Sequence, residues 1–249
     1  MRIVQISDLH IGEKGDDSPV GVKMLANVAK TIAHINQLDP QPDLVVINGN
    51  ITSNGTIEAS MNAREVLDAL NCPYKLVPGP NDERQTLFGT FGDKATANEV
   101  GGVLSYLVEG FPMRLIGLDS LGHHGVGGRV CPKRLNWLNT HLSSDTSVPT
   151  IIFTHHVPMK IGAAAADADG FDNGENLGAV VAQYSNINRI LCGHINLATH
   201  TAWQGTIVTS APSMGMPSGL EEGEAPAPAY HLHQMGEHGD LVTRTVFVE

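Results

Sequence analysis

The sequence contains few cysteines, and none of them lies close to another. Cys72, Cys131 and Cys192 are odd in number and show no CxxC spacing. This pattern argues against a disulfide framework and against a thiolate zinc site. Residues 1–6 lead directly into a predicted strand, with no charged segment followed by a long apolar one. From these absences we expect a cytoplasmic protein with reduced thiols.

Basic residues are also scarce, and long apolar runs are absent. The chain has 15 Lys and Arg against 26 Asp and Glu, for a net charge of −11. A negative surface repels nucleic-acid backbones, so a DNA or RNA polymer is not an expected partner. No stretch approaches the ~20 apolar residues of a membrane span, so we expect no membrane association. Small phosphate esters remain compatible, because a bound dication can dominate the field locally.

The composition and the order of elements predict one α/β domain over residues 1–249. Hydrophobic residues make up 41% of the 249, which is enough for a sizeable core. Apolar patterning predicts strands and helices in alternation, and then a final third that is mostly β. The predicted strands are 2–7, 43–47, 74–77, 103–108, 113–118, 150–154, 187–192, 198–203, 206–209, 229–233 and 241–248, and the predicted helices are 20–37, 56–70, 132–142 and 177–184.

Polar residues come directly after five of the predicted strands. These are Asp8 and His10, Gly49-Asn50, Gly79 to Asp82, His155-His156 and Gly193-His194. In open α/β sheets the carboxyl ends of the strands gather at one edge, where ligands bind. Five segments that are distant in sequence are therefore expected to converge on one site.

The residue types at this edge are typical of a metal site. Asp8 and His10 lie two apart, so on an extended segment their side chains point the same way. His155 and His194 each follow a buried strand. A lone histidine there is more often hydrogen-bonded to backbone, but the four together favour a divalent transition metal such as Mn²⁺, Fe²⁺ or Zn²⁺. We expect His156 to support His155 and not to bind the metal itself.

Five motifs resemble, in order and spacing, those of the calcineurin-like metallophosphoesterases, and most of all the bacterial cyclic nucleotide phosphodiesterase branch. They are Ile6-Ser7-Asp8-Leu9-His10, Gly49-Asn50-Ile51-Thr52, Pro78-Gly79-Pro80-Asn81-Asp82, His155-His156-Val157-Pro158 and Gly193-His194-Ile195-Asn196. The resemblance implies a four-layer α/β/β/α sandwich with two mixed sheets. It implies a two-metal site, with Asp8 and His10 on one metal and His155 and His194 on the other. The implied substrate is a cyclic nucleotide or another small phosphodiester.

The sequence departs from the family pattern at four positions. Asn50 stands where the family has a bridging aspartate, and Pro80 where it has an asparagine ligand. Asn81 replaces the catalytic histidine, and Asn196 replaces the last histidine ligand. Asn50 removes a negative charge and offers an amide nitrogen that donates rather than ligates. Asn81 can donate a hydrogen bond but cannot act as a general acid, whose loss typically costs ~10²–10⁴ in rate.

Because of these departures, more than one metal count and more than one function are compatible with the sequence. We predict one divalent transition metal ahead of none, and two metals last, with Asp8, His10, Asn50, His155, His194 and Asn196 as the candidate ligands. The function hypothesis is a metal-dependent phosphodiesterase with impaired metal binding. The alternative is a catalytically inactive relative that binds a nucleotide or a protein partner, or one whose site is only a structural remnant.

The remaining expectations concern substrate contacts and assembly. Asn81 is the candidate catalytic residue, and Asn81 and His124 are the candidate substrate-binding residues. Loops 121–129 and 161–176 are expected to set specificity. Residues 216–228 are expected to form a loop that closes over the site or packs on a second subunit, which leaves a homodimer open.

Overall fold

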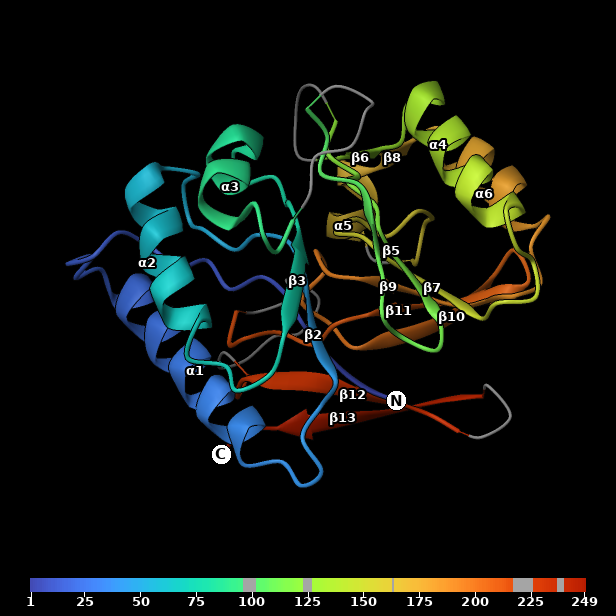
Figure 1. Ribbon diagram of the computed structural model, residues 1–249. Helices are drawn as coiled ribbons and strands as arrows, with labels where there is room; N and C mark the ends of the chain where they lie inside the picture. The colour runs from blue at the N-terminus through green and yellow to red at the C-terminus, as the bar shows by residue number, and fades with distance from the viewer. Residues whose placement is uncertain (96–101, 123–126, 163, 217–225, 237–239) are drawn as a thin grey trace.

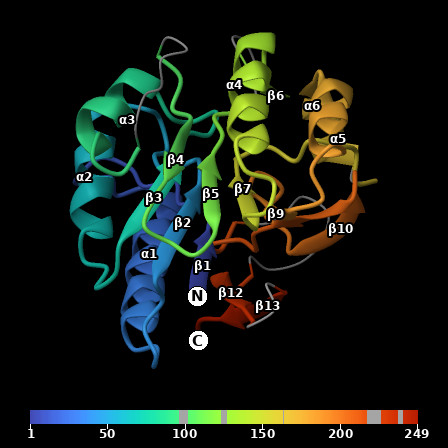
Figure 2. The same ribbon diagram turned by 45° about the vertical axis from the view of Figure 1, so that its right-hand side comes forward.

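Two mixed β-sheets pack face to face and carry helices on their outer faces, as the computed structural model shows (Figures 1 and 2). The structure describes residues 1–95, 102–122, 127–162, 164–216, 226–236 and 240–249. Helices α1, α2 and α3 lie on one side of the pair of sheets, and α4 and α6 lie on the other. The predicted four-layer α/β/β/α sandwich is confirmed.

The first sheet has five strands in the order β13-β12-β1-β2-β3. β1 pairs with β2, and β2 with β3, in parallel, whereas β12 is antiparallel to both β1 and β13. Its strands are β1 (Arg2–Ile6), β2 (Leu44–Asn48), β3 (Tyr74–Val77), β12 (Ala229–Met235) and β13 (Leu241–Phe247).

The second sheet has six strands in the order β10-β11-β9-β7-β5-β4, with a parallel centre and antiparallel outer pairs. Its strands are β4 (Tyr106–Val108), β5 (Arg114–Gly117), β7 (Thr150–Phe153), β9 (Ile187–Cys192), β10 (Thr199–Trp203) and β11 (Thr206–Ser210). A separate parallel pair consists of β6 (Gly128–Arg129) and β8 (Phe171–Asp172).

The first two helices begin where the sequence supplies a side-chain cap. Ser18 accepts a hydrogen bond from Gly21 N at the start of the first helix, and Thr56 accepts one from Ala59 N at the start of the second. The helices are α1 (Pro19–Asn36), α2 (Ile57–Leu67), α3 (Arg84–Phe91), α4 (Pro132–Ser143), α5 (Ala164–Asp169) and α6 (Gly174–Val181). No described helix is long and apolar enough to cross a bilayer.

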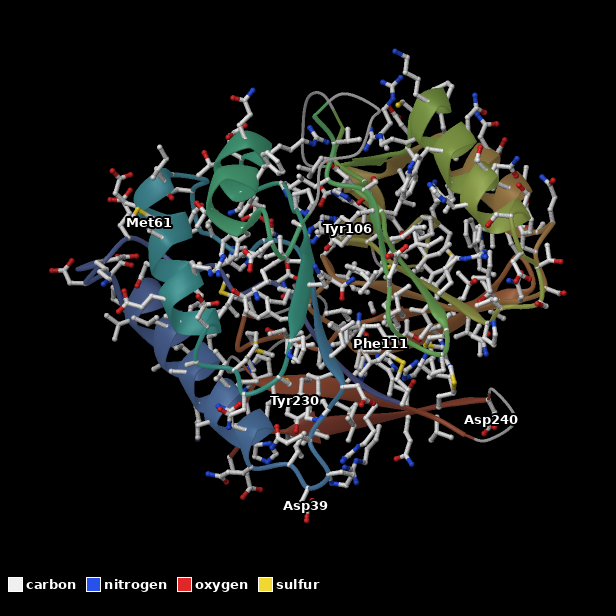
Figure 3. All side chains as sticks on the ribbon, in the orientation of Figure 1. Asp39, Met61, Tyr106, Phe111, Tyr230 and Asp240 are labelled. Atoms are coloured by element: carbon white, nitrogen blue, oxygen red, sulfur yellow. The ribbon has the colours of Figure 1, made fainter. Side chains whose placement is uncertain are left out.

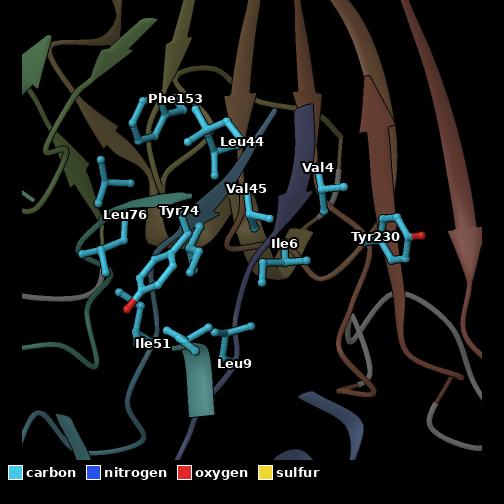
Figure 4. Packing of buried hydrophobic residues seen from close by; sticks show 14 of the residues in the cluster. Val4, Ile6, Leu9, Leu44, Val45, Ile51, Tyr74, Leu76, Phe153 and Tyr230 are labelled. Carbon is cyan, nitrogen blue, oxygen red and sulfur yellow. The ribbon is translucent and has the colours of Figure 1, made fainter. Parts of the chain in front are cut away.

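The central strands are apolar on both faces because each lies between a helix layer and the other sheet. Val4, Ile6 and Val45 are buried beside Leu76 and Phe153, so one cluster contains residues of both sheets (Figure 4). Such continuous apolar strands are expected where a parallel sheet is covered on both faces. This packing fixes the two sheets against each other, and with them the loops at their edges.

Tyr106 ties the two sheets together near the middle of the molecule (Figure 3). Its hydroxyl donates to Leu76 O at 2.5 Å and accepts from Leu76 N at 3.1 Å, and its ring packs edge-on against Phe153. Burial raises the pKa of this phenol far above its usual value, so it remains a neutral donor. β3 and the second sheet therefore keep a fixed relative position.

Two segments that we read as loops contain regular structure. Residues 121–129 include β6, and residues 161–176 include α5, β8 and the start of α6. α3 was also missed, because its eight residues are weakly amphipathic and contain Gly89. All the other predicted helices and strands are present, with ends shifted by a few residues.

Candidate metal and phosphoester site

The five motif segments meet at the carboxyl ends of β1, β2, β3, β7 and β9. Asp8 N donates to Gly49 O at 3.0 Å, and Gly193 N donates to His155 O at 2.8 Å. Asn48 of β2 donates to Leu191 O of the second sheet at 2.9 Å. These bonds join turns from both sheets at one place, as the sequence predicted.

Glycines make this convergence possible. A Cβ at Gly193 would collide with Ser7 Oγ, and one at Gly79 would collide with Asn50 N. Gly49 has φ +84°, and a Cβ there would lie 2.6 Å from His155 Nδ1. Only a residue without a side chain allows the backbones to approach so closely.

Most of the candidate ligands have left-handed backbone conformations. Asp8, His10, Asn50, His194 and Asn196 have φ between +46° and +75°. Such conformations cost about 1–3 kcal/mol each and persist only where the surroundings hold them, which is common at functional sites. The segment from Asp8 to His10 is therefore turned rather than extended, contrary to our expectation. The two side chains are nevertheless close, with His10 Nε2 3.9 Å from Asp8 Oδ1.

The Asp8 carboxylate is almost wholly buried and is satisfied by donors of the protein. Oδ2 accepts from Ser7 Oγ at 2.6 Å and from His194 N at 3.0 Å. Oδ1 accepts from Asn50 Nδ2 at 2.9 Å. The Asn50 amide oxygen accepts in turn from Asn81 N at 3.0 Å, which fixes the orientation of the amide. Asn50 therefore presents a donor to the carboxylate, where a bridging carboxylate would present a ligand to a metal.

His155 has the opposite character, because one of its ring nitrogens lacks a partner. The residue is fully buried, and Nδ1 bonds to Asn48 O at 2.5 Å. Nε2 is buried and has no hydrogen-bond partner among the described residues. Burial lowers the pKa of this imidazole well below its usual value, and the His194 and His10 rings lower it further. Because Nδ1 donates its hydrogen to the carbonyl, Nε2 of the neutral imidazole carries a free lone pair. A nitrogen in this state can bind a metal ion.

His155, His156 and His194 form a compact group. One ligand atom from each lies within 4.8 Å of the others. His156 Nδ1 bonds to Ser120 Oγ at 2.8 Å, and its ring packs edge-on against that of His155 with 4.8 Å between the centroids. Three imidazoles at this spacing suit a divalent transition metal better than Mg²⁺ or Ca²⁺.

Asp169, at the end of α5, is a site residue that the sequence analysis missed. Its Oδ2 lies 3.1 Å from His194 Nε2. A carboxylate in this position orients an imidazole and makes it a stronger base. The alanine run before Asp167 and Asp169 favours a short helix, but no signal in the sequence places that helix beside His194.

The other candidate residues differ in burial and in hydrogen bonding. Asn196 Oδ1 is buried and has no partner among the described residues, so it fits a ligand role. The Asn81 side chain is exposed and donates to Ser53 O at 3.0 Å. Pro80 supplies no ligand, and His124 lies outside the described residues.

Asp82 holds the turn that carries Asn81. Its buried carboxylate accepts from Gly79 N, Ile51 N and Thr52 N, and from Thr52 Oγ1, at 2.8–3.1 Å. Burial raises the pKa of the carboxyl, and these hydrogen bonds oppose the shift. Asp82 therefore orders the loop that follows β3.

Arg84, the first residue of α3, has a different role. Its guanidinium binds Asp119 through Nε at 2.6 Å and a second nitrogen at 2.9 Å. It also donates to Leu121 O at 2.9 Å. Arg84 therefore ties the start of α3 to the segment that follows β5, rather than ordering its own turn.

A small cavity of about 120 Å³ opens beside the histidines. His156 and His194 line it together with Met159, Lys160 and Phe171. A ligand in this cavity would therefore lie against the candidate metal-binding rings.

Two sheets with histidine, aspartate and amide side chains at their strand ends are compatible with a metal-dependent phosphoester hydrolase. The sequence model of the family "calcineurin-like phosphoesterase" matches residues 1–196, and the chain belongs to this family. A probable glycerophosphodiester phosphodiesterase of Arcobacter nitrofigilis is 32% identical, and the match covers 100% of this chain and 93% of that protein.

More distant proteins agree with this assignment. The 3′,5′-cyclic adenosine monophosphate phosphodiesterase of Escherichia coli K12 is 22% identical over 86% of this chain and 76% of its own length. A dimetal phosphatase from Danio rerio has a TM-score of 0.73 at 15% identity, and the match covers 100% of this chain and 99% of that one. The latter likeness bears on the fold alone.

Proposed function

We propose that this protein is a phosphodiesterase that hydrolyses a cyclic nucleotide or another small phosphodiester with one divalent transition metal. The observation that carries the proposal is the buried, unpartnered Nε2 of His155 within a three-histidine group. The similar proteins that are named as glycerophosphodiester and cyclic nucleotide phosphodiesterases support the substrate class.

We place the metal at the histidine end of the site. His155 and His194 are the proposed ligands, with His156 in the same group, and the buried, unpartnered oxygen of Asn196 is a further candidate. The Asp8 end fits a metal less well, because Asn50 Nδ2 occupies the oxygen that would face it. Zn²⁺, Mn²⁺ and Fe²⁺ are the candidate ions.

The bound ion would supply Lewis-acid polarisation of the phosphoryl group and activation of water. The chain's own residues orient the site. Asn48 O holds the His155 ring at Nδ1, and Asp169 holds the His194 ring at Nε2. We propose that Asn81 leaves Ser53 O to donate its amide hydrogen to a phosphate oxygen, without acting as an acid.

A second candidate function is that of a relative that binds a nucleotide or a partner without hydrolysing it. The hydrogen bond from Asn50 to Asp8 favours it, because this bond closes the position at which the family builds its metal bridge. A single domain over 1–249, a homodimer and a cytoplasmic location remain predictions.

Metal content by mass spectrometry tests the proposal first. After incubation with Mn²⁺, Fe²⁺ or Zn²⁺, the wild type should retain about one equivalent, and His155→Ala should retain none. His141→Ala, which alters a histidine of α4, is the matched control and should retain the metal. Hydrolysis of phosphodiesters by the loaded protein then separates the two functions. If the wild type retains no metal under any of these conditions, the proposal of a metal-dependent phosphodiesterase is wrong.

A further inference from the structure

A second and larger cavity adjoins the small one beside the histidines. Its volume is about 540 Å³, within the roughly 300–1,000 Å³ typical of small-molecule sites. The two cavities share four lining residues, namely Pro158, Met159, Lys160 and Phe171. The larger cavity therefore continues the space that begins at His156 and His194.

Three structural elements line the larger cavity together with residues 158–160. Phe171 comes from β8, Trp203 from the end of β10, and residues 173–176 from the first turn of α6. Gly128 pairs with Phe171, and a Cβ there would collide with the Phe171 ring and lie 2.6 Å from His156 Cβ. The Phe171 ring is thus held close to His156, on the wall common to both cavities.

Trp203 is also fixed in place. A Cβ added at Gly178 of α6 would lie 3.2 Å from Trp203 Cζ2, so the indole packs closely on this helix. The next two residues, Gln204 and Gly205, have φ of +50° and +82° and form the tight turn into β11. The indole is half-buried, so part of its surface is open to the cavity.

The chemistry of the lining fits a planar heteroaromatic group. Phe171, Trp203 and Met159 offer apolar surface, and the amides of Asn173, Asn176 and Gln204 offer both donors and acceptors. Asn173 makes no capping hydrogen bond to α6, so its amide is not engaged by the helix. Proteins hold an extruded base in the same way, by stacking and by hydrogen bonds to its edge.

The charges of the lining favour a base over a cationic head group. Lys160 and Glu175 are the two charged residues of the larger cavity, and their charges cancel. A quaternary ammonium would require an aromatic cage without a competing cation. From this arrangement we infer that the larger cavity is a subsite for the base of a nucleotide substrate, and that Phe171 and Trp203 determine specificity. The inference rests on the proposed function in one respect, namely that the phosphate of the substrate binds at the histidines.

Fluorescence of Trp203 tests the subsite without any turnover. The chain has two tryptophans, so Trp137→Phe leaves Trp203 as the only one. The probes are adenosine, choline and glycerol, added to this variant in the presence of EDTA. We expect a saturable change of Trp203 emission with adenosine, in the millimolar range, and none with choline or glycerol. A response to choline alone, or no response to adenosine up to its solubility limit, would overturn the inference.

Kinetics test the specificity. Phe171→Ala and Trp203→Ala should lower the ratio of kcat/KM for 3′,5′-cyclic AMP to that for glycerophosphoglycerol by about tenfold, the scale of one lost base–aromatic stack. Phe247→Ala, at an exposed aromatic residue of β13, is the matched control and should leave the ratio unchanged. An unchanged ratio in both cavity variants would refute their role. If the wild type hydrolyses neither substrate, the proposed function fails, whereas the adenosine titration still tests the subsite.

Discussion

Asn50→Asp gives the sharpest test of how the Asp8 end of the site is held together. In the wild type the Asn50 amide donates to Asp8 Oδ1 at 2.9 Å, and Asn50 is almost wholly buried. The substitution replaces this donor with a second carboxylate at the same place. A hydrogen bond to a charged group is lost, which is worth about 1.5–3 kcal/mol. Two like charges about 4 Å apart add repulsion of about 4 kcal/mol at an effective dielectric constant of 20.

Protonation of one carboxyl limits this cost, so we expect a loss of about 3 kcal/mol in the free energy of unfolding at pH 8. In the folded variant the two neighbouring carboxyl groups raise each other's pKa, so the folded protein takes up one proton at this pair as the pH falls. The loss should therefore shrink toward pH 5 and be largest above the folded pKa. Mn²⁺ should reduce the loss in Asn50→Asp more than it alters the wild type, because the new carboxylate can ligate.

Urea unfolding at pH 8 and pH 5, with EDTA and with Mn²⁺, measures each of these effects. Asn71→Asp, at an exposed position, is the matched control and should change stability by less than about 0.5 kcal/mol. If Asn50→Asp in EDTA is as stable as the control at pH 8, the amide does not hold the Asp8 carboxylate and our account of this end of the site is wrong.

Three further predictions concern the scaffold around the site. Asp82→Ala strands three backbone N–H groups and should lower the free energy of unfolding by about 3 kcal/mol or more in urea titrations. Gly193→Ala forces a methyl group onto Ser7 Oγ, so the melting temperature should fall and metal retention should weaken. Burial lowers the pKa of His231 to about 4 and also lowers that of His233 well below its usual value, so the unfolded chain binds more protons and stability should decline as the pH falls from about 6.5 toward 4. His231→Gln should flatten this decline in melting curves recorded across that pH range, and an unchanged slope would contradict the assignment.

The strand ends were predictable because their signal is local. A short apolar run followed by Asp8, His155 or His194 indicates a buried strand and a polar turn, and the topology of parallel strands brings such turns together. The long helices were predictable for the same reason, since their caps and apolar periodicity lie in adjacent residues.

The contacts inside the site were not predictable, because they depend on atoms from separate turns. Nothing in the sequence says that the Asn50 amide nitrogen, and not its oxygen, faces Asp8. That orientation is fixed by Asn81 N, from another strand end. Asp169 was missed for a similar reason, because its meeting with His194 depends on where a six-residue helix lies.

The asparagine at position 50 is more than a lost ligand, because its amide joins three strand ends by hydrogen bonds. Asp8 follows β1, Asn50 follows β2 and Asn81 follows β3, and the amide contacts both of the others. In the family pattern a metal bridge would join the corresponding turns. The wild type should therefore keep these turns in place without metal, and EDTA should lower its melting temperature by less than it lowers that of Asn50→Asp. Hydrogen bonds hold the Asp8 end of the site without an ion. The proposed single metal at the histidines is therefore compatible with an ordered Asp8 end.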